Sequence, residues 1–290
     1  MSSLLAVRLF DLLARLSLRT LHRLGVTLGW GTYLLSGKYA ERLRENLGYE
    51  WEGRPEVDFR RVLGANVAEA GKGVMELPWV WRRPLSDVLA SVQSCEGWEH
   101  VVAAQARGKG IVFLTPHIGC FEVIALYLGA HMPLTSMYRV PKLAWLDGVM
   151  RQGRERGQMK LARADIGGVR ALYKALKRGE AIGLLPDQVP GNGEGEWIPF
   201  FGRPAYTMTL VSRLVESSEA AVLMCVAQRL PNGAGYALHF SPLTLHTDTS
   251  VTLQINQAVE SLVRACPEQY LWSYNRYKIP AGVAPPASEA

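Results

Sequence analysis

Residues 111–130, IVFLTPHIGCFEVIALYLGA, decide the fold of this chain. They comprise a short apolar run, a turn that contains Pro116 and Gly119, and a second apolar stretch that is long enough for a helix. A short apolar run rich in β-branched residues and bounded by turn residues is typical of a buried strand. This stretch therefore predicts a strand over 111–115 that leads through a turn into a helix.

Strand and helix patterns alternate from this stretch towards the C-terminus. The other expected strands are 133–139, 159–163, 181–186, 220–230 and 235–243, the last two as a hairpin across residues 231–233. The expected helices are 121–130, 142–156, 167–179, 209–218 and 252–265. Such alternation implies parallel strands joined by right-handed crossovers. We therefore expect an α/β fold, with a largely parallel central sheet covered by helices.

The N-terminal segment has apolar residues at helical spacing. Its basic residues at the intervening positions are Arg8, Arg15, Arg19 and Arg23. The longest stretch without charge, residues 24–37, has only 14 residues, whereas a helix that spans a bilayer needs about 20. An amphipathic helix in the membrane interface is therefore expected. A helix packed on the protein's own core and a tilted single span from residue 24 are the alternatives.

Composition and charge limit the possible partners. The chain is 48% apolar and 20% charged, as folded globular proteins are. Its net charge of +6 favours an anionic membrane surface or an acidic protein. Nucleic acid is not expected, because there is no long block of Lys and Arg. We divide the chain into membrane-associating helices (1–48), a main domain (49–278) that is mostly helical over 55–106, and a disordered Pro/Ala-rich tail (279–290).

Four cysteines are present, at positions 95, 120, 225 and 266. They form no CxxC pair, and their spacing fits neither a zinc site nor a disulfide framework. The expectation is a reduced protein that faces the cytoplasm, with no metal and no cofactor.

Polar residues collect where active sites of such sheets lie. Loops 116–121, 139–142 and 187–197 each follow the carboxyl end of an expected strand. The first carries His117, and Glu122 follows five residues later at the start of the next helix. Across a turn into a helix the two side chains can meet, so that the carboxylate orients the imidazole and stabilises its protonated form.

A histidine held in this way can take a proton from an alcohol without an enzyme nucleophile. Alternatively, Cys120 beside His117 could form an acyl-enzyme. We favour a packing role for Cys120, because a cysteine after a buried strand is more often a small apolar residue.

Four segments together carry a resemblance to a known family. They are His117-x4-Glu122, Tyr138-Arg139, LLPDQVPG (184–191) and PFFGRPAYT (199–207). In this order they resemble the bacterial lipid A biosynthesis acyltransferases, which add fatty acyl chains to lipid A precursors. The similarity extends from the basic N-terminal segment to YLWSYNRYK, which ends at residue 278.

The resemblance implies a reaction without a covalent intermediate. His117 would act as general base on a hydroxyl of a lipid A precursor, with Glu122 orienting it. The freed oxygen would attack the thioester of an acyl carrier protein. The acceptor would be a phosphorylated glycolipid of lipopolysaccharide biosynthesis, and the enzyme would work at the cytoplasmic face of the anionic inner membrane.

The resemblance also implies substrate-binding residues. Arg139 would hold a substrate phosphate. Asp187 and Gln188 would arrange the acceptor or the cleft wall, and Arg203 would contact phosphate or the carrier. The family often has a doubled arginine where this chain has SYNRYK, which leaves the role of Arg276 open.

Three other functions compete with this interpretation. A glycerol-phosphate or lysophospholipid acyltransferase would use the same His/Glu pair, but LLPDQVPG replaces the F-P-E-G-T-like block of those enzymes. A thioesterase or lipase would need a G-x-S-x-G elbow, which this sequence lacks. A non-catalytic membrane lipid-binding protein fits the N-terminus but gives His117 and Glu122 no purpose.

Overall fold

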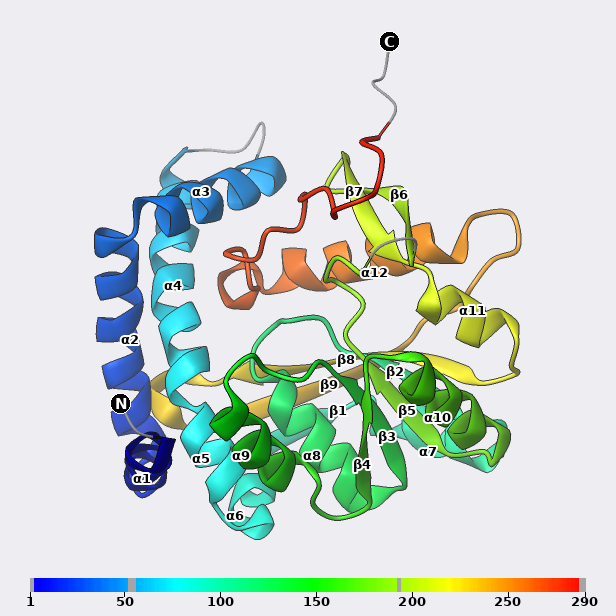
Figure 1. Cartoon of the computed structure of the whole chain (residues 1–290), viewed down its shortest axis with the longest axis horizontal. Helices are drawn as coiled ribbons and strands as arrows, with labels where there is room; N and C mark the ends of the chain where they lie inside the picture. The colour runs from blue at the N-terminus through cyan, green and yellow to red at the C-terminus, as the bar shows by residue number, and fades with distance from the viewer. Residues whose placement is uncertain (1–2, 52–55, 192–193, 287–290) are drawn as a thin grey trace.

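The computed structural model describes residues 3–51, 56–191 and 194–286. Its centre is a seven-stranded sheet in the order β1-β9-β8-β2-β5-β3-β4 (Figure 1). The strands are β1 (Val92–Glu96), β2 (Ile111–Leu114), β3 (Leu134–Tyr138), β4 (Met159–Arg163), β5 (Ala181–Leu184), β8 (Ala221–Arg229) and β9 (Tyr236–Pro242). Every neighbouring pair is parallel except the β8–β9 hairpin. The predicted largely parallel sheet and its C-terminal hairpin are confirmed.

Helices cover both faces of the sheet, and each face has its own hydrophobic core. In β2, the side chains of Ile111 and Phe113 lie in one core and those of Val112 and Leu114 in the other. The first core includes α7 (Trp98–Ala106), α8 (Phe121–His131) and α9 (Ala144–Arg154). The second includes α10 (Ile166–Lys177), α11 (Leu210–Glu216) and α12 (Val251–Ala265). This two-sided burial explains why the central strands β2, β5 and β8 are almost continuously apolar.

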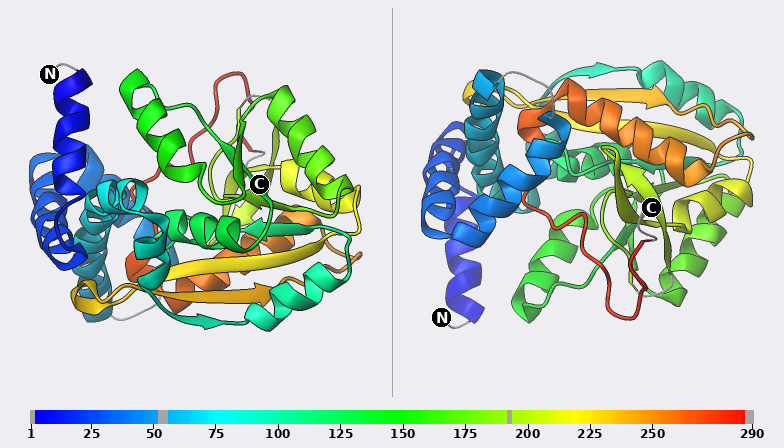
Figure 2. Two further views of the ribbon diagram at one scale, coloured as in Figure 1. Left: turned by 90° about the horizontal axis from the view of Figure 1, so that it is seen from below. Right: turned by 90° about the horizontal axis from the view of Figure 1, so that it is seen from above.

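The chain begins with a group of helices beside the sheet. They are α1 (Ser3–Leu13), α2 (Leu18–Leu35), α3 (Gly37–Trp51), α4 (Glu56–Met75), α5 (Leu77–Arg82) and α6 (Leu85–Ala90). Figure 1 shows α2 and α4 side by side, and Figure 2 shows α1 projecting from the rest of the chain. The backbones of α2 and α4 approach so closely that a Cβ on Gly71 would lie 1.9 Å from the Gly25 carbonyl oxygen. In the parts of the chain that the structure describes, no helix combines the length and the apolarity that a membrane span requires.

Three strands differ from the sequence prediction. β1 was expected to be helical, but it pairs in parallel with β9 at the edge of the sheet. β6 (Gly195–Phe200) and β7 (Arg203–Met208) form a separate antiparallel hairpin that was not expected, and the predicted 187–197 loop therefore ends where β6 begins. Pro199 and Pro204 lie opposite one another in this hairpin. Proline is unusual inside strands, so these two prolines argued against a strand prediction for this segment.

Part of the expected C-terminal tail contacts the hairpin. The Trp197 indole Nε1 donates a hydrogen bond to the Ala284 carbonyl oxygen at 3.0 Å. Residues 287–290 of that tail lie outside the described residues.

Candidate active site

His117 and Asp187 meet because they follow neighbouring parallel strands at the same offset. Leu114 at the end of β2 is the register partner of Leu184 at the end of β5. His117 and Asp187 each come three residues after these partners. The His117 Nδ1 atom lies 2.8 Å from Asp187 Oδ1, and the His117 backbone N–H donates to Asp187 Oδ2 at 2.9 Å. The carboxylate thus holds both the ring and the backbone of the histidine.

The Asp187 carboxylate also determines which ring nitrogen of His117 is basic. Burial raises the pKa of Asp187, but the His117 charge and the hydrogen bonds from its ring and backbone outweigh this effect and lower that pKa below its usual value. An ionised carboxylate only accepts hydrogen bonds, so Nδ1 carries the proton and Nε2 keeps its lone pair. The Gln188 side-chain Nε2 lies 3.0 Å from His117 Nε2 and donates to it.

The turn that carries His117 is held by backbone hydrogen bonds. Gly119 has a φ of +59°, and a Cβ there would lie 2.0 Å from the Ala227 carbonyl oxygen, so only glycine fits. The Gly119 N–H donates to the Gln269 carbonyl oxygen at 3.0 Å, and the Leu271 N–H donates to the His117 carbonyl oxygen at 3.0 Å. Strand β8 and the segment after α12 therefore fix the position of the histidine.

Glu122 does not make the expected contact with His117. It lies in the first turn of α8 and is 3% exposed. Its Oε2 accepts hydrogen bonds from the Trp81 indole Nε1 at 2.9 Å and from Arg154 Nε at 2.8 Å, and its Oε1 pairs with Arg154 Nη2. The helix begins one residue earlier, at Phe121, whose ring lies against the imidazole with centroids 4.9 Å apart. Glu122 is therefore held by residues of α5 and α9, and no hydrogen bond or ion pair joins it to the ring that it was expected to orient.

A cavity of about 180 Å³ lies between α4 and the turn that carries His117. His117 and Glu122 both border it, and apolar residues form much of the remaining wall, among them Val74, Leu77 and Leu271. A second, smaller cavity of about 30 Å³ lies on the other side of Glu122. Its apolar lining includes Phe113, Ile124, Leu128, Leu134 and Met159. A basic nitrogen beside apolar walls suits proton transfer on an amphipathic substrate.

Comparison with known proteins identifies the family. Residues 3–279 match the family model described as bacterial lipid A biosynthesis acyltransferase. The chain belongs to this family. It is similar to the lipid A biosynthesis lauroyltransferase of Escherichia coli (strain K12), with 29% identity over 96% of this chain and 92% of that protein. It also resembles the palmitoleoyltransferase of the same strain, with 28% identity over 81% of this chain and 77% of that protein. It is therefore an acyltransferase of lipid A biosynthesis.

Of the two arginines predicted to bind substrate in the acyltransferase, Arg139 is exposed and Arg203 is partly buried. Arg139 directly follows β3, at the same sheet edge as His117. Arg203 is the first residue of β7, and its guanidinium lies 4.4 Å from the ring centre of Tyr49 and 5.0 Å from that of Tyr277. It also pairs with Glu45 at 3.4 Å. The role of Arg139 in holding a phosphate and that of Arg203 in contacting phosphate or the carrier stay predictions.

Cys120 is poorly suited to act as a nucleophile in the acyltransferase. It is 1% exposed, and burial, together with the negative charge of Glu76, raises the pKa of its thiol well above the usual value. A thiol that stays protonated is a weak nucleophile. Over residues 3–51, 56–191 and 194–286, no three His, Cys, Asp or Glu side chains are grouped so that they could hold a metal ion.

Sequence reasoning missed the residues of the acyltransferase that contact the segment from His117 to Glu122 but lie far from it in the sequence. Trp81 and Arg154 hold Glu122 but lie in segments without a motif. Arg229 ends β8, and Glu76 lies between α4 and α5, yet both are buried and paired with each other. One sequence feature could have indicated a buried ion pair. Arg229 is a charged residue near the end of the otherwise mostly apolar stretch AAVLMCVAQRL.

Proposed function

We propose that the acyltransferase moves a fatty acyl chain from an acyl carrier protein to a hydroxyl of a phosphorylated lipid A precursor, with His117 as general base. The His117–Asp187 pair beside an apolar cavity is the observation that carries the proposal. The family membership supports the acceptor class. Asp187 takes the orienting role that the sequence suggested for Glu122.

The reaction needs one proton acceptor and no covalent enzyme intermediate. The acceptor hydroxyl replaces the Gln188 amide at His117 Nε2 and gives its proton to that nitrogen. Its oxygen attacks the thioester carbonyl carbon, the C–S bond breaks, and the imidazolium returns the proton to the leaving thiolate. Asp187 stabilises the imidazolium while it exists.

Transfer by the purified acyltransferase tests this function. Incubation with an acyl carrier thioester and a lipid A precursor should yield a product heavier by one acyl chain and an equal amount of free carrier thiol. Thioester hydrolysis without acyl transfer would contradict the proposal.

A basic surface supports an acidic carrier as the donor. Arg139, Arg163 and Arg170 are exposed. The hydrogen bond of Arg163 with Tyr138, together with the nearby charges of Asp147 and Asp165, raises the pKa of its guanidinium. They lie near the carboxyl ends of β3 and β4, beside Ile166, which is 73% exposed. Strands are spaced by about 4.8 Å, so these ends lie roughly 10 to 15 Å along the sheet from β2 and His117. A flexible thioester arm can cross that distance.

Reversing charges on this surface should weaken the carrier specifically. Arg163→Glu with Arg170→Glu should raise KM for an acyl carrier thioester by about tenfold, because charge complementarity mainly governs encounter. KM for the matching coenzyme A thioester should change little. The control is Lys174→Glu with Lys177→Glu, which alters the net charge equally at the other end of α10. A preference of the wild type for coenzyme A, or equal effects of both double variants, would contradict the proposal.

Exposed leucines on α1 support attachment to an anionic membrane surface. Leu4, Leu5, Leu9 and Leu12 are 47–61% exposed. Arg8 on the same helix is also exposed. Apolar and basic side chains together suit the membrane interface. Deleting residues 1–35 would also remove Leu21 and His22, which are buried against the rest of the chain, so substitution on α1 is the sharper experiment.

Replacing these four leucines by glutamine should reduce vesicle binding while leaving the fold intact. Burial of each leucine in a membrane contributes about 1.5 to 3 kcal/mol, so binding should fall at least about a hundredfold. Sedimentation with vesicles of phosphatidylethanolamine and phosphatidylglycerol measures it, and high salt should release part of the wild type. Val102→Gln, at an exposed position on α7, is the matched control. Unchanged binding of the fourfold variant would exclude α1 as the anchor.

A further inference from the structure

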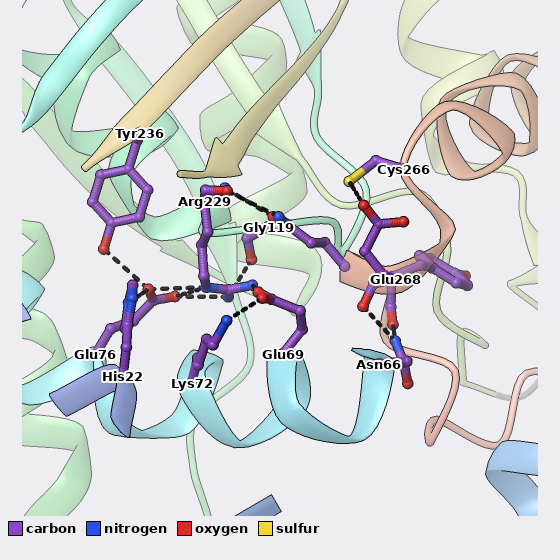
Figure 3. A network of polar contacts seen from close by, with 12 residues as sticks. His22, Asn66, Glu69, Lys72, Glu76, Gly119, Arg229, Tyr236, Cys266 and Glu268 are labelled. Atoms are coloured by element: carbon purple, nitrogen blue, oxygen red, sulfur yellow. Dashed lines mark hydrogen bonds and ion pairs between the residues drawn. The ribbon is translucent and has the colours of Figure 1, made fainter. Parts of the chain in front are cut away.

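A buried network of charged residues lies directly behind the catalytic turn (Figure 3). Arg229 Nε and Nη2 donate to the Glu76 carboxylate at 2.7–2.9 Å. Glu76 is 1% exposed and also accepts from the Tyr236 hydroxyl at 3.0 Å and contacts His22 Nε2 at 3.2 Å. Through His22 the network reaches helix α2.

One end of this network holds the backbone of Gly119. Arg229 Nη2 donates to the Gly119 carbonyl oxygen at 2.7 Å. The Gly119 N–H is bound by the carbonyl oxygen of Gln269, whose side-chain amide is in turn bonded to the backbone N–H and C=O of Arg229. The Gly119 carbonyl therefore depends on the Arg229 side chain, and the Gly119 N–H is linked through Gln269 to the Arg229 backbone. Gly119 lies two residues after His117.

We infer that Arg229 is a positioning residue for the acyl transfer: its guanidinium holds the Gly119 carbonyl and thereby the His117 turn, while Glu76 balances its buried charge. This inference rests on the proposed role of His117 as base. A buried ion pair is a weak source of stability, because apolar residues of similar volume stabilise a core equally well. Apolar residues, however, could not donate a hydrogen bond to the Gly119 carbonyl oxygen.

Three variants separate positioning from stability. Arg229→Met removes the donor and leaves the buried Glu76 carboxylate without its guanidinium partner, with only Tyr236 and His22 as contacts, so Tm and kcat should both fall. Glu76→Gln also lowers Tm but keeps the Arg229 bond to Gly119, so kcat should stay within a few fold of the wild type. In Glu76→Gln with Arg229→Met, no buried charge lacks a partner and the glutamine can still accept from Tyr236 and His22. Its Tm should recover towards that of the wild type, while kcat stays about a hundredfold low, as expected for a small misplacement of the base.

KM for both substrates should change much less than kcat in every variant. Arg229 and Glu76 border the cavity, but their side chains are buried and their polar atoms are bonded within the network and to Gly119. Lys72→Met is the matched control: Lys72 pairs with Glu69 at the edge of the network and makes no described contact with the turn.

If kcat follows Tm through all variants, the network is only structural and the inference is wrong. If Arg229→Met does not fold, the comparison of Glu76→Gln with the double variant decides. If the double variant does not fold either, Arg229→Lys decides, because lysine keeps the charge but not the forked donor. It should show a low kcat at a Tm near that of the wild type. Full activity of Arg229→Lys would overturn the inference. A fully active His117→Ala would instead overturn the proposed base.

Discussion

His117→Ala should lower kcat by about a hundred- to ten-thousandfold, the usual contribution of a positioned general base. The fold should survive, because the His117 side chain is 12% exposed at the wall of a cavity and carries no core packing of β2. A transfer assay beside a thermal melt measures both quantities.

Cys120→Ala is the matched control for this variant. It changes a neighbouring side chain in the same turn but removes no group that the reaction uses, so activity should remain. An inactive Cys120→Ala with a normal melting curve would revive the acyl-enzyme mechanism.

Asp187→Asn should reduce kcat nearly as much as His117→Ala. The asparagine amide is uncharged, so it stabilises the imidazolium poorly and no longer fixes the proton on Nδ1. Because the folded-state pKa of Asp187 is lowered, the carboxylate is ionised above its usual pKa of about 3.9 and loses its effect only as pH falls below that value. The charge of Asp187 should therefore not change between about pH 6 and pH 9, and Asp187→Asn should stay impaired throughout that range.

Glu122→Gln provides the contrast to Asp187→Asn. Burial lowers the pKa of Arg154, but the Glu122 charge and hydrogen bond outweigh it and raise that pKa, so the guanidinium stays charged. Leaving this charge without its partner should cost about 3 to 5 kcal/mol of stability. Glu122→Gln should thus lower Tm and kcat together, whereas Asp187→Asn acts mainly on kcat. A Glu122→Gln variant that is inactive at normal Tm, beside an active Asp187→Asn, would return the orienting role to Glu122.

The sequence predicted the features that follow from periodicity. Apolar runs gave β2, β3, β4, β5 and the β8–β9 hairpin, and the turn after β2 gave the location of His117. The Asp187 contact was also within reach, because His117 and Asp187 both lie in loops that follow the carboxyl ends of expected strands. It was missed because the order β2-β5-β3 is a property of the assembled sheet, and strand order is not encoded locally.

The remaining differences arise from long-range contacts. Glu122 was assigned to His117 by its distance in sequence, whereas its partners are 41 and 32 residues away, at Trp81 and Arg154. The Glu76–Arg229 pair spans 153 residues. Consecutive side chains at the start of a helix point in different directions. At the start of α8, the ring of Phe121 therefore contacts the imidazole and the Glu122 carboxylate does not.

The central claim is that His117 catalyses acyl transfer to a lipid A precursor. Mass spectrometry of lipid A from cells that lack the gene, complemented with wild type or with His117→Ala, tests it most directly. We expect lipid A in the deletion to lack the mass of one acyl chain, wild type to restore it, and His117→Ala, present at equal level, to leave it missing. Lipid A that is unchanged by the deletion, or that is restored by His117→Ala, would contradict the account.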